Sequence, residues 1–135
     1  MEIIPTDREL ETLKALWKHG DATVRELHER IQESGSKLAY TTVLSLLQVM
    51  EQKGLVTHRP SGKAYLYSAA VQRDSTFQKL AGGFLEKVFD GAVDEYLVHA
   101  LESKRPGNEE LDRLEQMIAG ARAKSKRTTR KGNPS

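Results

Sequence analysis

The sequence predicts a mainly α-helical protein with one small β-hairpin, and three observations support that fold class. Apolar residues recur every three or four positions through most of residues 6–118, which is the spacing of one helix face. Glycines follow several of these stretches, at positions where helices often stop. Residues 55–67 differ, because two β-prone runs flank a turn that contains proline and glycine, as in a hairpin.

Two capped helices are expected first. Thr6 with Glu9 and Thr23 with Glu26 have the spacing of a capping box, in which each side chain bonds the other residue's backbone N–H. The apolar positions after these caps are Leu10, Leu13, Leu16 and Trp17 in the first helix and Val24, Leu27 and Ile31 in the second. We expect these helices to end before glycines 20 and 35, and residues 21–23 between them to form at most one β-bridge.

A third helix is expected from Thr41 to the Lys53-Gly54 pair. One face is apolar, and it consists of Val43, Leu46, Leu47 and Met50. The opposite face has hydroxyl and amide side chains. With the hairpin after it, the order of helix, helix, helix, hairpin predicts a winged helix-turn-helix domain in residues 1–70.

The second half predicts three more helices and a helical dimerisation domain in residues 71–120. The first runs from about Gln72 to a break at Asp90-Gly91, the second ends before Arg105, and the third starts at Asn108 and ends near Gly120. Single apolar faces in about 50 residues make a small core, so we expect a second copy to cover them; one compact monomer is the alternative. The expected dimerisation residues are Phe77, Leu80, Phe84, Leu85, Phe89, Leu97, Leu101, Leu111, Leu114 and Ile118.

Charge is unevenly distributed along the chain. The formal net charge is +2, but residues 122–131 contain six Lys or Arg and no acid, so the other 15 Lys and Arg face 19 Asp and Glu. We expect residues 121–135 to be a basic, disordered tail. With no cysteine, no signal-peptide pattern and no apolar stretch near the roughly 20 residues of a membrane span, we expect a cytoplasmic protein.

The third helix is the candidate DNA-reading element. Its polar face can bond base edges in a major groove, since Gln bonds adenine and Thr or Ser bonds several bases. The expected base-contacting residues are Thr41, Thr42, Ser45 and Gln48. Residues around the helix and hairpin, in a region without acids from residue 53 to 70, would hold phosphates. These expected phosphate contacts are Lys37, Tyr40, Lys53, Arg59 and Lys63.

An enzyme is not expected. The four histidines, at positions 19, 28, 58 and 99, are scattered, and no nucleophile with a base, phosphate loop or metal-ligand cluster stands out. We therefore expect no catalytic residue, no metal and no cofactor.

Several motifs together resemble the penicillinase-repressor family of the BlaI/MecI type. They are LKALW at 13–17, TVREL at 23–27, LAYTTVLSLL at 38–47, EQKGLV at 51–56, GKAYLY at 62–67 and FDG at 89–91, and the resemblance covers about residues 5–120. It implies a homodimeric repressor on a two-fold symmetric DNA operator. It also implies release when a membrane sensor protease triggers cleavage in the dimerisation region, here near His99-Ala100, where the Asn-Phe pair of the staphylococcal members is absent. Without cysteine, the copper-responsive relatives with a cysteine-rich metal hook are not matched.

Two alternatives stay open at this stage. A winged helix can serve only as a protein-interaction module, since fold alone does not decide function. A repressor can instead sense a small molecule without proteolysis, in a pocket to which Phe84, Tyr96 and His99 would contribute.

Overall fold

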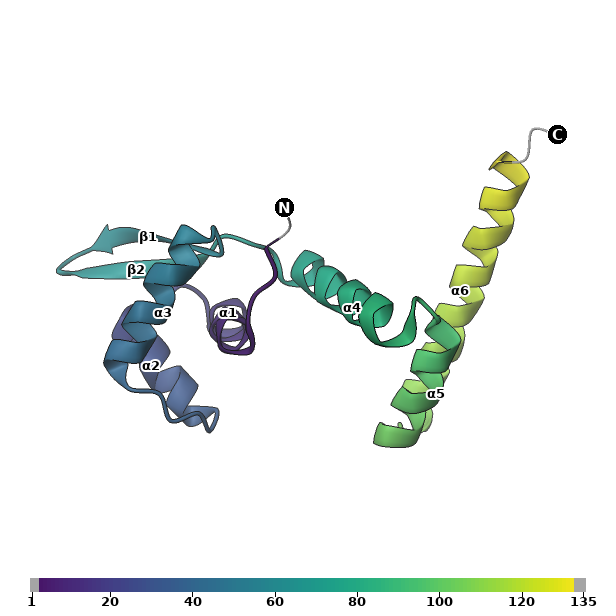
Figure 1. Ribbon diagram of the computed structural model, residues 1–135, viewed down its shortest axis with the longest axis horizontal. Helices are drawn as coiled ribbons and strands as arrows, with labels where there is room; N and C mark the ends of the chain where they lie inside the picture. Colours follow the sequence, from purple (N-terminus) through teal and green to yellow (C-terminus); the bar gives the residue numbers. More distant parts are fainter. Residues whose placement is uncertain (1–2, 133–135) are drawn as a thin grey trace. The chain divides into compact units, whose positions relative to one another are not determined.

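The computed structural model describes the backbone of residues 3–132 and the side chains of residues 3–127. This part of the chain contains six helices and one two-stranded sheet (Figure 1). It divides into two compact units, residues 1–84 and 85–135. The boundary lies inside the fourth helix, later than the boundary after residue 70 that the sequence suggested.

The first unit contains α1 (Asp7–His19), α2 (Val24–Glu33), α3 (Tyr40–Gln52), β1 (Val56–Ser61), β2 (Ala64–Ala69) and most of α4 (Arg73–Phe89). Both predicted capping boxes are present, with Thr6 and Thr23 as the N-caps. The third helix begins one residue earlier than predicted, at Tyr40. The order of these elements is that of a winged helix-turn-helix domain.

The core of this unit comes from the predicted apolar faces of the first three helices. Its buried helical residues are Leu13, Leu16, Val24, Leu27, Ile31, Val43, Leu47 and Met50. Leu55, Val56 and Tyr67 close the core from the hairpin side. Each large apolar side chain buried in this way stabilises the fold by about 1.5–3 kcal/mol, so the core holds α3 rigidly.

The hairpin is short, and it is anchored to the helices. Its antiparallel strands pair from Val56 with Ala69 to Ser61 with Ala64, which leaves a two-residue turn. Gly62 occupies the first turn position with a φ of 63°, where type II′ turns prefer glycine. Backbone hydrogen bonds of 3.0 and 2.7 Å join Ala22 and Tyr67, so the predicted single bridge is confirmed and fixes the hairpin beside α2.

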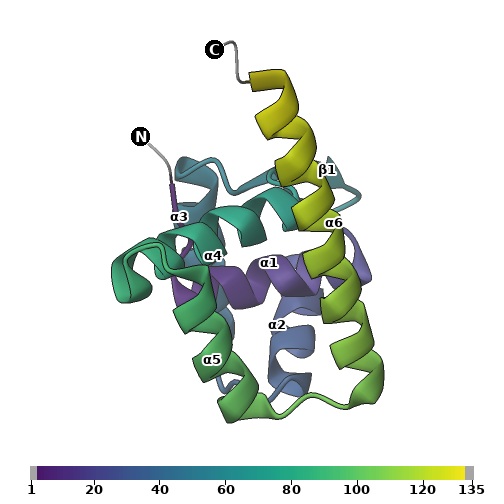
Figure 2. The same cartoon turned by 90° about the vertical axis from the view of Figure 1, so that its right-hand side faces the viewer.

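The second unit contains the end of α4, then α5 (Val93–Lys104) and α6 (Asn108–Gly132). The predicted break after α4 is confirmed, because Asp90 and Gly91 have φ values of 51° and 84°, a conformation that ends a helix. Helices α5 and α6 run in opposite directions and are joined by residues 105–107 (Figure 2). Within the described residues, each helix is too short or too polar to cross a membrane.

Helix α6 is longer than the sequence suggested. The expected end at Gly120 is wrong, because the helix continues to Gly132. One helical glycine costs only about 1 kcal/mol relative to alanine, and the neighbouring Ala119, Ala121 and Ala123 are strong helix formers. Most of the tail that was expected to be disordered is therefore helical, and its residues 133–135 lie outside the described residues.

Candidate nucleic-acid interface

The polar face of α3 is open to solvent over an apolar back. Thr41, Ser45 and Gln48 are exposed and Thr42 is half-buried. The opposite face, formed by Val43, Leu47 and Met50, is fully buried. This arrangement follows from helical spacing, and it leaves the four predicted base-contacting side chains on a rigidly supported surface.

The N-terminus of α3 is positioned by α2. A ring nitrogen of His28 lies 2.8 Å from the carbonyl oxygen of Leu38, and the His28 ring packs edge-on against Tyr40 at 5.9 Å. No side chain caps the helix at Ala39, so its first backbone N–H groups remain available to an anion. With Lys37 and Tyr40 exposed beside it, this helix start suits a phosphate group.

A groove of about 430 Å³ lies between the start of α2, the start of α3 and the hairpin. Lys63, one of the predicted phosphate contacts, lines this groove from the hairpin turn. The sequence analysis did not select two further residues here, Arg25 and Tyr65. The cation of Arg25 is highly exposed and only 3.8 Å from Glu29, and the Tyr65 ring is 56% exposed. Alternation along β2 puts Tyr65 on the same side as buried Tyr67, with half-buried Leu66 between them, so strand spacing alone did not indicate that Tyr65 is exposed.

The hairpin is less positive in space than along the sequence. Residues 53–70 contain no acid, but Arg59 donates a 3.0 Å hydrogen bond to Asp21, which comes from the α1–α2 connection. Hydrogen bonds with Ser68 and Arg59 lower the pKa of Asp21, so it stays ionised near neutral pH. Likewise His58 lies 2.6 Å from Glu51 of α3. The charge of Arg59 is therefore partly neutralised by Asp21. Of the two hairpin cations, Lys63 is the more available for a phosphate contact.

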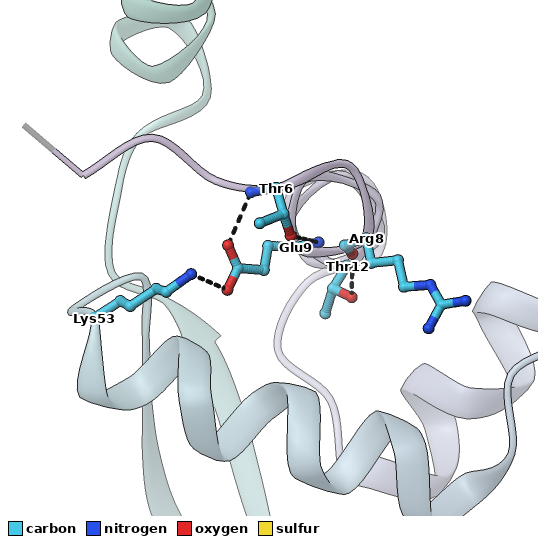
Figure 3. Close-up of polar contacts among 5 residues, drawn as sticks. All are labelled: Thr6, Arg8, Glu9, Thr12 and Lys53. Carbon is cyan, nitrogen blue, oxygen red and sulfur yellow. Dashed lines mark hydrogen bonds and ion pairs between the residues drawn. The ribbon is translucent and has the colours of Figure 1, made fainter.

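Lys53 has a structural partner. Its ammonium lies 2.8 Å from a carboxylate oxygen of Glu9, which is only 2% exposed, and the other oxygen accepts from the Thr6 backbone (Figure 3). Burial raises the pKa of Glu9, but the hydrogen bonds of Lys53 and Thr6 outweigh burial and hold that pKa below its ordinary value. This ion pair joins the end of α3 to α1. Lys53 therefore already has an anionic partner within the protein, which leaves it less available for a phosphate group.

Four of the ten predicted dimerisation residues are exposed, and the other six are half-buried. Phe84 and Ile118 are about half exposed, and within the described part of the chain α5 buries no residue. Other exposed apolar residues on α4, α5 and α6, outside the expected dimerisation set, include Val88, Val93, Val98 and Met117. Leu80, Leu85, Leu97 and Leu114 are half-buried, and Leu101 and Leu111 are just over a third exposed.

Phe77, one of the predicted dimerisation residues, packs within the first unit. Its ring meets Trp17 of α1 edge-on at 5.7 Å, and the guanidinium of Arg73 lies 4.5 Å from the ring centre. The Trp17 side chain also donates a 3.0 Å hydrogen bond to the Val71 carbonyl oxygen. The start of α4 is thus tied to α1, which is the reason that the first unit extends past residue 70.

Metal binding would need a cluster of ligating side chains such as histidines and carboxylates. Among the described residues, no three or more His, Asp or Glu side chains gather in a way that could hold a metal ion. Two of the four histidines, His28 and His58, take part in the contacts described above.

Residues 5–120 match the family described as "Penicillinase repressor". This chain belongs to the penicillinase repressor family. The predicted family is therefore confirmed. The sequence is 24% identical over 120 residues to the penicillinase repressor of Bacillus licheniformis, over 87% of this chain and 93% of that protein. It is 33% identical over 115 residues to the transcriptional regulator BlaI of Mycobacterium tuberculosis, over 84% of this chain and 81% of that protein.

A solved structure supports the fold of this penicillinase repressor family member. The crystal structure of YusO from Bacillus subtilis aligns with a TM-score of 0.51 and 21% identity, over 87% of this chain and 74% of that chain. At this identity the similarity concerns the fold alone.

The family resemblance placed a cleavage site near His99 and Ala100. In this penicillinase repressor family member both residues lie within α5. His99 is exposed and its ring lies 5.6 Å from that of Phe89, while Ala100 is half-buried. Cleavage here would require α5 to open locally, because a protease binds its substrate as an extended strand.

Proposed function

We propose that this chain is a transcriptional repressor that binds a two-fold symmetric DNA operator as a homodimer. Family membership supports the coarser statement, that it is a DNA-binding repressor and not an enzyme. The observation that carries the finer proposal is the exposed polar face of α3, held from behind by fully buried Val43, Leu47 and Met50.

In this proposal α3 enters the major groove. Gln48 and Ser45 bond base edges, and Thr41 and Thr42 bond bases or place a methyl group against thymine. No Arg or Lys lies inside α3, so strong contacts to guanine are not expected from it. We therefore propose an operator with A·T pairs at the positions that α3 contacts.

Phosphates would be held around the edge of this surface. The uncapped start of α3 with Lys37 and Tyr40 supplies one contact, and the groove edge with Lys63 supplies another. Arg25 and Tyr65 line the same groove and are added to the proposal. Arg59 and Lys53 take smaller parts, since Asp21 and Glu9 already pair with them.

The second unit would form the homodimer. Its exposed apolar side chains on α4, α5 and α6 would be buried against a second copy, which removes apolar surface from water. A two-fold dimer then supplies two reading helices at a fixed spacing, as a symmetric operator requires. We further propose that cleavage within α5, triggered by a membrane sensor protease, ends repression by separating the paired reading helices.

Selection of DNA from a random duplex library tests this function. The bound fraction is sequenced, and we expect an enriched inverted repeat whose half-site centres are about 10 base pairs, or a multiple of that, apart. A matched selection with Gln48→Ala protein should lose preference within each half-site. An enriched single half-site without symmetry would contradict the dimer, and no enrichment at all would contradict the DNA-reading role of α3.

A further inference from the structure

The last part of α6 is a continuous basic helix. Arg122, Lys124, Lys126 and Arg127 are all exposed, and residues 130 and 131 add two more cations to the same helix. The last acid of the chain is Glu115. We call residues 122–131 the basic arm. The sequence suggested a disordered tail, whereas the structure presents these charges along a helix.

The rest of the second unit has the opposite charge. Residues 85–121 contain nine Asp or Glu and four Lys or Arg, so an acidic body carries the basic arm. None of the ion pairs formed by the described side chains includes an arm residue. The four described cations of the arm are therefore available to an anionic partner.

Helical spacing brings the arm's cations together. Arg122 and Lys126 are four residues apart, and Lys124 and Arg127 are three apart, so each pair is adjacent on the helix surface. Like charges at these spacings destabilise a helix, although the negative end of the helix dipole offsets part of that effect. A bound polyanion would remove the repulsion, so binding should also stabilise the arm's helix.

We propose that the basic arm is a second DNA-binding element that contacts the phosphate backbone without reading bases. This inference rests on the proposed function, which brings the protein to duplex DNA. A helix of about 10 residues is roughly 15 Å long, and duplex DNA carries one charge per roughly 1.7 Å, so the arm can meet several phosphates. A membrane surface fits less well, because the described arm residues 122–127 include no large apolar side chain to insert.

The test compares two variants with equal loss of charge. The arm variant combines Lys124→Gln, Lys126→Gln and Arg127→Gln. The control combines Lys87→Gln, Lys104→Gln and Arg113→Gln, exposed cations of the same unit that lie outside the arm. Fluorescence anisotropy measures the Kd for a labelled operator duplex and for a scrambled duplex between 50 and 200 mM KCl.

We expect the arm variant to lose salt dependence, because each lost phosphate contact lowers the slope of log Kd against log salt by about 0.9. Loss of three contacts per chain is six contacts in the homodimer, which predicts a decrease of about 5.4, equal for both duplexes, and little change in the control. Circular dichroism should also show that DNA increases helix content more in the unmodified protein than in the arm variant.

Other results would overturn the inference. If the unmodified protein binds operator with a steep salt dependence and both variants keep the same slope, the arm does not contact DNA and the proposed function stands. If the unmodified protein binds no duplex, the proposed function itself fails. An unchanged slope in the arm variant together with lost binding to phosphatidylglycerol vesicles would assign the arm to membranes. An unchanged slope with a dimer weakened only in the arm variant, measured by sedimentation, would assign it to the acidic body of a second copy.

Discussion

Glu9 has two roles in the folded chain, a local one in the capping box of α1 and a long-range one as the partner of Lys53. Its spacing from Thr6 predicts a capping box, which the structure contains. The same carboxylate is also buried and bonded to Lys53, 44 positions away. Local spacing contains no information about that partner, so the sequence analysis assigned Lys53 to phosphate instead.

Glu9→Gln should lower the free energy of unfolding at pH 7 by about 1–2 kcal/mol, because hydrogen bonds to a charged group are lost while Lys53 is partly exposed to water. The folded pKa of Glu9 is below its ordinary value of 4.5, so its stabilisation is full above that pH and is lost as pH falls through the folded pKa. Urea denaturation at pH 7 and pH 3 measures this. The difference between the two proteins should shrink at pH 3, and an equal difference at both would refute the ion pair's contribution.

Gln48 and Lys63 should differ in what they contribute to DNA binding. Gln48→Ala should reduce the preference for operator over scrambled duplex by about 1–3 kcal/mol, the value of a good base contact. Lys63→Ala should weaken both complexes about equally and reduce the salt slope by about 1 per chain, or about 2 for the homodimer. Titrations of both duplexes measure this, with Gln32→Ala, an exposed glutamine at the end of α2, as the control. The same sequence dependence in both variants would contradict the assigned roles.

At the scale of elements, α3 and the hairpin were predicted well because their signals are local. The apolar face of α3 and the Gly62 turn follow from residue spacing and backbone preference. The charge of the hairpin was predicted less well, because Asp21 and Glu51 approach it from other elements. Acid-free sequence therefore overstates the positive charge of the hairpin surface.

Replacing two glycines by alanine should show how backbone conformation, rather than packing, decides the effect on the free energy of unfolding. A Cβ atom at Gly83 or at Gly35 would meet no atom within 4 Å, but Gly83 is helical while Gly35 has a φ of +103°. Gly83→Ala should stabilise the protein by about 0.4–1 kcal/mol by restricting the unfolded chain, and Gly35→Ala should destabilise it by at least as much. Urea denaturation measures both. If Gly83→Ala were destabilising, this glycine would have a role in α4 other than chain flexibility, such as close contact with another copy.

At the scale of the whole molecule, the second unit leaves large apolar side chains exposed on each of its helices. Met117 is 64% exposed and Val93 is 55% exposed. A contiguous exposed apolar surface usually marks an interaction site. The homodimer is the proposal that accounts for it.

Phe84→Asp should convert the dimer into monomers and weaken operator binding by at least tenfold, because a charge would be buried in an apolar contact and the paired reading helices would separate. Sedimentation and operator titration measure the two effects. Gln78→Asp, an exposed position in the same helix, adds the same charge and should leave the dimer intact. A stable Phe84→Asp dimer would remove this side chain from the interface.

The sequence alone determined the features that depend on neighbours along the chain. These are the helices and their caps, the hairpin, the break at Asp90-Gly91 and the polar face of α3, since helical spacing and backbone preference act over a few residues. Only the tertiary structure shows which of the predicted site residues already pair or pack with another part of the protein. Lys53 and Arg59 are paired and Phe77 packs on Trp17, because burial and ion pairing join residues that are distant in sequence. The end of α6 also required the structure, because one glycine among strong helix formers is too weak a signal to mark a terminus.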